Sequence, residues 1–132
     1  MGGVSSKPAG TRQPEFYKKL LEKIEIVDVA FGRSRLRFRV LPQHLTDRGT
    51  LRKSVCIALA DRAIGIAVGT TGKKVKLLNL QVGYLRMVEA GQVLECRGLI
   101  IYNGERILVS QACLAVPNYQ VATAVGIYYV TD

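Results

Sequence analysis

The segment over residues 51–70 limits the possible folds most, because it is apolar on nearly every side of a helix. A helix of about eighteen residues would extend about 27 Å and would be buried over most of its surface. A sheet that wraps around the helix would remove that surface from water. Small residues at Ala58, Gly65 and Gly69 predict one thin side, which the sheet would approach closely. The large apolar side chains of the segment are Val55, Ile57, Leu59, Ile64, Ile66 and Val68.

Strand patterns occupy most of the remaining chain. A short amphipathic helix over residues 15–23 precedes two strand runs, 24–31 and 34–41, which Gly32-Arg33 joins as a hairpin. Four more runs follow the long helix, and we expect them to form an antiparallel meander. These runs cover residues 74–87, 92–102, 106–116 and 121–130. The order predicts an α+β fold, an antiparallel sheet of about six strands wrapped around one long central helix, and favours sheet pairing between subunits.

The chain has 132 residues, which is enough for one domain. We expect this domain over residues 15–132, after a flexible tail over residues 1–14 that is rich in Gly, Ser and Pro. No apolar run is long enough to span a bilayer and no signal-peptide core is visible, so a cytoplasmic location is expected. The single histidine excludes multi-histidine metal sites, the cysteines have no zinc-site spacing, and no cofactor is expected. Apolar contexts predict buried, reduced thiols for Cys56, Cys96 and Cys113.

Positive charge is concentrated in the first part of the chain. The formal net charge is +9, and residues 1–53 hold twelve of the nineteen Lys and Arg residues. Such a surface attracts anions such as phosphate-bearing metabolites, anionic lipid or nucleic acid. Four arginines alternate with apolar residues, which places them on one face of a strand. A solvated outer face is favoured over a nucleic-acid stripe, because neither interleaved aromatic residues nor a binding module is visible. These arginines are Arg33, Arg35, Arg37 and Arg39.

Asp61 is the residue of the long helix that most needs an explanation, because its helical neighbours are apolar. Burial of an ionised carboxylate without a partner costs several kcal/mol. In one interpretation, Asp61 meets an arginine or backbone amides from a strand or another subunit. In the other, it is a general base or nucleophile whose pKa burial raises. A weaker hydrolytic set combines His44 with Cys56 or Ser54 and Asp47, although a surface or capping role is favoured for His44.

Five short motifs, taken together, suggest a family. They are Gly49-Thr50-Leu51, Asp61-Arg62-Ala63-Ile64-Gly65, residues 79–86, Gly91 and Asn103-Gly104-Glu105-Arg106. Through these motifs the chain over residues 24–130 resembles the hotdog-fold acyl-CoA thioesterases of the phenylacetyl-CoA thioesterase-like group. The resemblance implies a helix wrapped by an antiparallel sheet, and homodimers or homotetramers with active sites between subunits.

The resemblance also implies roles for single residues. Asp61 falls on the family's catalytic carboxylate, which activates water or attacks the thioester carbonyl. The backbone N–H of Lys53 would polarise that carbonyl, and Thr46 lies where the family has a polar residue. Arg86 and the turn with Gly104 and Arg106 fall where the family commonly meets CoA. Two departures stand out: Arg52-Lys53-Ser54 replaces His-Gly-Gly at the mouth of the expected pocket, and Leu77 replaces a frequent Ser or Thr.

These observations predict hydrolysis of an acyl thioester carried by CoA or by a carrier protein, with Asp61 as base or nucleophile. The replaced His-Gly-Gly motif keeps an alternative open, namely a non-catalytic hotdog module that binds or senses acyl-CoA. A third interpretation is a lipid-anchored scaffold, because the N-terminus matches the N-myristoylation pattern at Gly2. In a eukaryotic source this modification would give weak membrane association, with the basic N-terminal half as the second signal.

Overall fold

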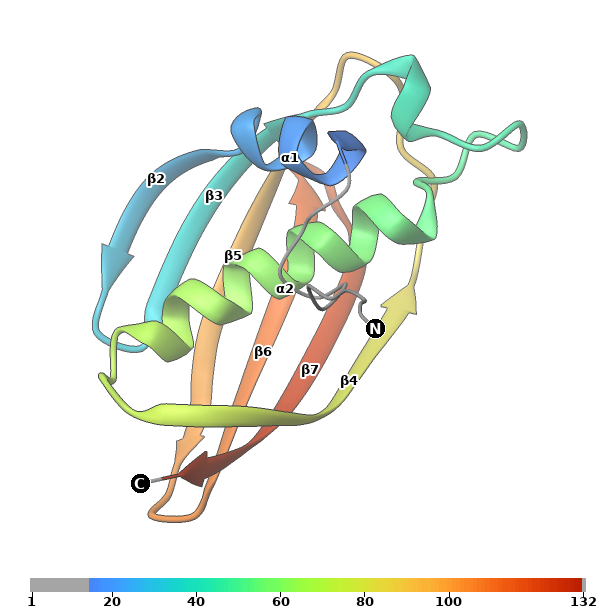
Figure 1. Ribbon diagram of the computed structural model, residues 1–132. Coiled ribbons are helices and arrows are strands. Elements are labelled where there is room, and N and C mark those ends of the chain that lie inside the picture. The colour runs from blue at the N-terminus through green and yellow to red at the C-terminus, as the bar shows by residue number, and fades with distance from the viewer. Residues whose placement is uncertain (1–14, 132) are drawn as a thin grey trace, which may run out of the picture.

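The structure, a computed structural model, describes residues 15–131. Its six strands form a single antiparallel sheet that curves around the long helix, and the short N-terminal helix lies at the end of the sheet where β2 begins and β3 ends (Figure 1). The elements are α1 (Glu15–Glu22), β2 (Glu25–Ala30), β3 (Arg33–Arg39), η2 (Pro42–His44), α2 (Lys53–Gly69), β4 (Lys74–Tyr84), β5 (Val93–Asn103), β6 (Ile107–Val116) and β7 (Tyr119–Thr131). The predicted α+β architecture of a six-stranded sheet around one long helix is confirmed.

The order of the strands corrects one prediction. The sheet runs β2-β3-β5-β6-β7-β4, so only β5, β6 and β7 form the expected meander. β4 pairs with β7 at the far edge, while β5 pairs with β3. This arrangement lets both β3 and β5 cover α2, and it places β4 at the edge of the sheet opposite β2 (Figure 1). Alternation along the sequence indicates which face a residue occupies, but it carries no information about which strands are neighbours.

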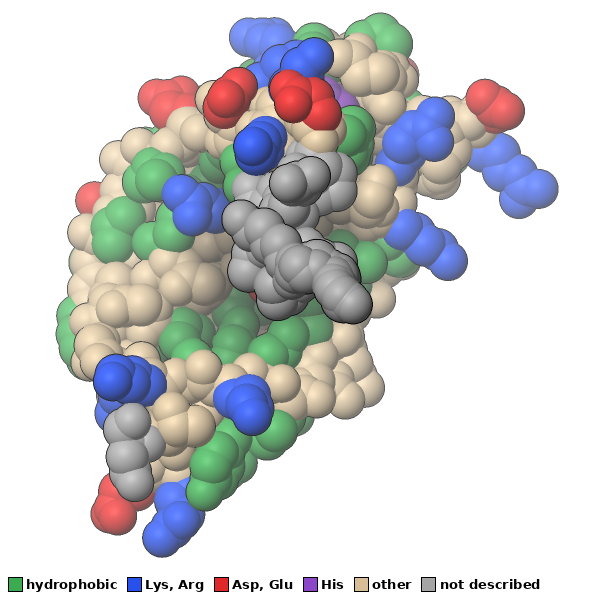
Figure 2. Space-filling view, in the orientation of Figure 1, with side chains coloured by type: hydrophobic (Ala, Val, Ile, Leu, Met, Phe, Trp, Pro, Cys, Tyr) green, Lys and Arg blue, Asp and Glu red, His purple; other side chains and the backbone are tan. Residues whose placement is uncertain are grey.

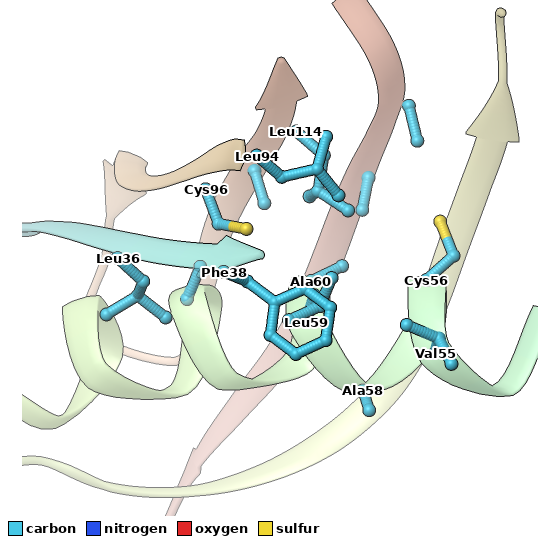
Figure 3. Close-up of a cluster of buried hydrophobic side chains, with 14 of the residues drawn as sticks. Leu36, Phe38, Val55, Cys56, Ala58, Leu59, Ala60, Leu94, Cys96 and Leu114 are labelled. Carbon is cyan, nitrogen blue, oxygen red and sulfur yellow. The ribbon is translucent and has the colours of Figure 1, made fainter. Parts of the chain in front are cut away.

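The helix α2 is buried on the side that faces the sheet, where Leu36, Phe38 and Leu94 pack against it (Figure 3). The opposite side is open, and Ile57 on it is 43% exposed. The prediction that the helix is buried over most of its surface is borne out on the side that faces the sheet, where nine of its 17 residues are buried, while the opposite side stays exposed. The buried residues of α2 are Val55, Cys56, Ala58, Leu59, Ala60, Ala63, Ile64, Ala67 and Val68.

The closest approach of helix and sheet depends on Gly98 of β5. A Cβ atom at this position would lie 2.7 Å from the carbonyl carbon of Ala63 and 2.7 Å from Ser34 Oγ. The Ser34 hydroxyl donates a hydrogen bond of 2.6 Å to the Ala63 carbonyl. Gly65 and Gly69 are exposed and have nothing within 4 Å of a Cβ, so the prediction that they face the sheet is wrong. The missing side chain that permits close packing belongs to the sheet.

Gly98→Ala is therefore expected to destabilise the fold by about 3 kcal/mol, because the added methyl group overpacks a rigid backbone contact. Gly69→Ala is the matched control, since Gly69 is the last residue of α2 and nothing lies within 4 Å of its Cβ position, so stability should change by less than about 1 kcal/mol. Urea denaturation of the two variants measures both effects. Equal stability of Gly98→Ala and the unmodified chain would show that the helix does not approach the sheet as closely as described.

The arginine face of β3 points away from α2, as predicted, while Ser34, Leu36 and Phe38 are buried. Three of its four arginines have polar partners within the protomer. These partnerships match those of a solvated outer face. They are Arg35 with Glu95 at 3.5 Å, Arg37 with Glu25 at 3.8 Å, and Arg39 donating to the Gly91 carbonyl at 3.0 Å.

His44 is buried rather than at the surface, and its side chain caps the η2 turn rather than the start of α2. Its Nδ1 accepts a hydrogen bond of 3.0 Å from the backbone N–H of Leu41, and its ring lies 4.9 Å from that of Phe38. Burial, and secondarily the charge of Lys23, lower its pKa. Cys56 and Cys96 are buried free thiols as predicted, whereas Cys113 is only half-buried. No helix within residues 15–131 has the length and hydropathy of a membrane span.

Candidate functional site

Asp61 lies at the middle of α2, half-buried. Burial raises the pKa of its carboxyl group. Within residues 15–131, its carboxylate takes part in no ion pair and no side-chain hydrogen bond. The neighbouring Arg62 is exposed, and adjacent helix positions do not face each other. The partner that a purely structural Asp61 would need is thus not found among residues 15–131 of this protomer.

Two tyrosines that the sequence analysis missed lie within the electrostatic reach of Asp61. Tyr17 on α1 is half-buried, and Tyr128 on β7 is only 7% exposed. Burial is the larger cause that raises the pKa of both phenols, and the charge of Asp61 raises them further. The pKa of Tyr128 rises to about 12, so this phenol is protonated at neutral pH. A carboxylate and two neutral phenols therefore share one region beside α2.

The first turn of α2 leaves backbone amides without a capping group. Arg52 is the N-cap, its side chain makes no capping hydrogen bond, and the first turn contains no acidic residue. The first amide bonded back to the cap is that of Cys56, which donates to the Arg52 carbonyl at 2.9 Å. The N–H groups of Lys53 and Ser54 precede it, at the electropositive end of the helix. Such amides can bind a developing negative charge.

A hollow of about 370 Å³ lies beside this helix start. Its walls are mainly apolar, two threonines add hydroxyl groups, and Lys53 and Arg86 supply positive charge with no acidic residue among the lining side chains. Lys and Arg side chains surround the nearby loop that projects from the molecule (Figure 2). The hollow therefore suits an apolar group next to an anionic one. It is lined by Thr46, Thr50, Leu51, Lys53, Tyr84, Leu85, Arg86, Met87 and Val121.

The predicted site residues fall in three places. Thr46, Lys53 and Arg86 come together at the hollow. Arg52 and Ser54 lie at the start of α2 but do not line the hollow. The Arg52 Nε donates a hydrogen bond of 3.1 Å to the Gln43 carbonyl. The remaining predicted residues are remote from the hollow. Asp61 is eight residues along α2 from Lys53, about 12 Å away. Gly104 and Arg106 lie at the β5–β6 turn, at the other end of the sheet (Figure 1). Gly2 lies outside the described residues.

Thr46 is engaged within its own loop. Its hydroxyl lies 2.7 Å from that of Thr50 and accepts backbone hydrogen bonds of 3.3 Å from Arg48 and Thr50. These bonds hold the loop that carries the chain into α2. The hydroxyl thus shapes the hollow, with part of its hydrogen-bonding capacity already used.

The weaker hydrolytic set does not form. The Nδ1 of His44 is occupied by the Leu41 amide. Burial raises the pKa of the Cys56 thiol to about 11, although a hydrogen bond with the Tyr84 side chain lowers it. Cys56 points toward the strand β4 (Figure 3) and is protonated at neutral pH, which disfavours it as a nucleophile. Within the described residues, no group of three or more His, Cys, Asp or Glu side chains forms a metal site.

The free edge of the sheet lies next to the open face of α2. β4 is an edge strand, paired with β7 alone. Leu77 is 45% exposed and Leu78 is 55% exposed on this strand, and hydrophobic side chains line the surface between α2 and β4 (Figure 2). Ile57 on α2 is also exposed, and we call these three apolar side chains, Ile57, Leu77 and Leu78, the β4 surface.

The sequence matches no protein-family model, and a search of the curated proteins finds no match. Solved structures do match. A point variant of the phenylacetic acid degradation protein PaaI from Thermus thermophilus has a TM-score of 0.78 and 24% identity, over 88% of this chain and 98% of that chain. Thioesterase superfamily member 2 of zebrafish has a TM-score of 0.81 and 18% identity, over 93% of this chain and 91% of that chain.

A hypothetical thioesterase from Streptococcus pneumoniae TIGR4, solved with coenzyme A, has a TM-score of 0.78 and 22% identity. That match covers 83% of this chain and 87% of the other. Likeness at such identities establishes a shared fold. The chain has the hotdog fold of the PaaI-like thioesterases, as its motifs predict.

Proposed function

We propose that the protein hydrolyses acyl thioesters of the CoA type, with Asp61 as the general base. The observation that carries the proposal is a half-buried carboxylate on the central helix of this fold, with no side-chain partner among the described residues of its own protomer. Burial raises its pKa, which suits a group that must take up a proton during turnover. Structures of the same fold are those of thioesterases, one of them solved with coenzyme A.

The active site is built from two copies of the chain. In one copy, Asp61 and the Lys53 amide are about 12 Å apart along α2, which is too far for both to contact one thioester. A two-fold axis beside β4 would pair the β4 surfaces and place the two α2 helices antiparallel. The first turn of one helix then lies toward Asp61 of the other. The exposed Ile57, Leu77 and Leu78 support this contact, because it covers them.

In this composite site, the thioester carbonyl oxygen accepts a hydrogen bond from the Lys53 N–H. Asp61 takes one proton from a water molecule as the water oxygen attacks the carbonyl carbon. The tetrahedral intermediate places its negative charge on the oxygen that faces the helix start, where the dipole of α2 stabilises it. The carbon–sulfur bond then breaks, Asp61 passes its proton to the departing sulfur, and CoA leaves as a thiol.

The positive charges suit the phosphates of CoA. Arg86 and Lys53 border the hollow, and the Arg86 guanidinium lies 5.4 Å from the ring centroid of Tyr119, which orients it. Antiparallel pairing of β4 would also bring the turn with Gly104 and Arg106 of the second copy near Arg86. The pairing would thus bring Arg86 of one copy near Gly104 and Arg106 of the other, the residues expected to contact CoA.

A thiol-release assay over acyl-CoA esters of increasing chain length, and over acyl-carrier thioesters, tests the proposal. We expect hydrolysis of at least one class. The alternative is a non-catalytic acyl-CoA-binding module, favoured by Arg52-Lys53-Ser54 in place of His-Gly-Gly. Binding of CoA esters by calorimetry without thiol release over the whole panel would contradict hydrolysis and support that module.

A further inference from the structure

We infer that Tyr128 is a catalytic residue that holds the attacking water together with Asp61. This inference rests on the proposed hydrolysis and adds a residue to it. Tyr128 belongs to the strand β7 and Asp61 to the helix α2, so the two side chains come from facing elements. Its direct neighbour across the ladder on β4 is Leu77, so β4 offers no hydroxyl at this point. The phenol of Tyr128 supplies one.

The position of the Tyr128 ring is set by Gly126 of the same strand. A Cβ at Gly126 would lie 3.1 Å from the Tyr128 ring carbon Cε1, 3.5 Å from its oxygen and 3.6 Å from Cγ2 of Ile64. The ring therefore folds back along the strand over Gly126, beneath Ile64 of α2. Ile64 is one helical turn from Asp61. This packing fixes the phenol beside α2, on the side of the helix that faces β7.

Four titratable side chains lie near the proposed water position. Asp61 and Arg62 belong to α2, Tyr17 comes from α1 and Tyr128 from β7. The charge of Asp61 reaches Tyr128, yet no direct hydrogen bond of 3.5 Å or less joins the two described side chains. In this inference, one water molecule lies between the two side chains, since ordered water can bridge polar groups that do not bond directly. One water molecule that donates a hydrogen bond to each side chain would direct its lone pair toward a thioester on the open side of α2.

The phenol stays neutral throughout the step. Because its pKa is about 12, Tyr128 is protonated at neutral pH and does not compete with Asp61 for the water proton. As the water oxygen bonds to the carbonyl carbon, one of its O–H bonds breaks and that proton passes to Asp61. The other O–H keeps its hydrogen bond to the Tyr128 oxygen until the acid product leaves. Tyr128 therefore orients the nucleophile without transferring a proton.

Tyr128→Phe tests this inference with a change of one hydroxyl group. We expect kcat to fall about tenfold while KM changes less than about twofold, because the water loses one of two anchors. The ionised form of Asp61 also loses part of its hydrogen bonding. Its pKa should therefore rise, and the acidic limb of the kcat/KM profile should move to higher pH by about half a pH unit or more.

Tyr129→Phe is the matched control, since Tyr129 is the next residue of β7, points to the outer face and is 38% exposed. It should leave kcat, KM and the pH profile unchanged. Unchanged kcat and pH profile in Tyr128→Phe would overturn the inference. A lower kcat and a shifted pH profile in Tyr17→Phe, with no change in Tyr128→Phe, would also overturn the inference. That result would place the attacking water beside Tyr17 of α1.

A readout without substrate separates this inference from the proposed function. Carbon-13 NMR of the Asp61 carboxyl group measures its pKa in the free protein. If the pKa of Asp61 rises in Tyr128→Phe but stays unchanged in Tyr129→Phe, the result supports the water bridge even if no thioester is hydrolysed. An equal Asp61 pKa in all three proteins would contradict the bridge even if the unmodified protein is an active thioesterase.

Discussion

Replacement of Asp61 by Asn is expected to lower kcat for thioester hydrolysis by a factor of about 10² or more, the scale of positioned acid–base catalysis. The amide has nearly the same shape as the carboxyl group but cannot accept the proton of the attacking water. KM should change little, because the proposed contacts with CoA lie elsewhere. Steady-state thiol release with the best acyl-CoA ester measures both constants. Unchanged turnover would remove Asp61 from the mechanism.

The same variant should be at least as stable as the unmodified protein at neutral pH. Burial raises the pKa of Asp61 in the folded state above its unfolded value, so the ionised carboxylate costs stability above the folded-state pKa. Asn removes that cost. The gain should disappear as the pH falls below the ordinary carboxyl pKa, where Asp61 is neutral in both states. Denaturation at several pH values therefore distinguishes a catalytic loss from a folding loss.

Lys53→Pro is expected to lower kcat by about 10²–10³, the range observed when one oxyanion donor is removed. Proline lacks the N–H group but suits the first position of a helix, where that N–H has no partner inside the helix. The preceding Arg52 has φ −60° and ψ 140°, which is the extended conformation that a residue before proline prefers. The variant should therefore fold normally while the carbonyl loses its hydrogen bond.

Lys53→Ala is the control for the loss of the lysine charge, because alanine retains the backbone N–H. Its kcat should stay within about threefold of the unmodified value. Its KM should rise at low salt and approach the unmodified value as salt screens the CoA phosphates. If Lys53→Ala and Lys53→Pro lose the same activity, the side chain rather than the amide carries the effect.

Most of the fold could be predicted from the sequence because its elements have clear periods. The apolar segment 51–70 predicted α2, and the alternating arginines predicted the two faces of β3. The place of β4 could not be predicted, since strand order depends on contacts between distant segments. The role of Gly98 was missed for a related reason: it is one glycine in a strand, and only the contact with Ala63 shows why no side chain fits.

A candidate site residue could be picked out from the sequence where one residue stands out from its neighbours. Asp61 is such a residue, because a carboxylate in an apolar helix contradicts its surroundings. Tyr17 and Tyr128 look like ordinary amphipathic positions in a helix and a strand, so only the packing of α1 and β7 on α2 relates them to Asp61. The sequence also could not show that Arg52 turns toward the Gln43 carbonyl while Lys53 borders the hollow.

The central claim is that each active site takes Asp61 from one copy of the chain and the Lys53 amide from another. Mixing the Asp61→Asn and Lys53→Pro variants under conditions that allow subunits to exchange tests it directly. In a two-fold dimer, half of the dimers would be mixed, and each would contain one intact site, so about a quarter of the unmodified activity should return. Analytical ultracentrifugation confirms that dimers have formed. No recovery of activity in exchanged dimers would contradict the claim, because it would place both groups of each site in a single chain.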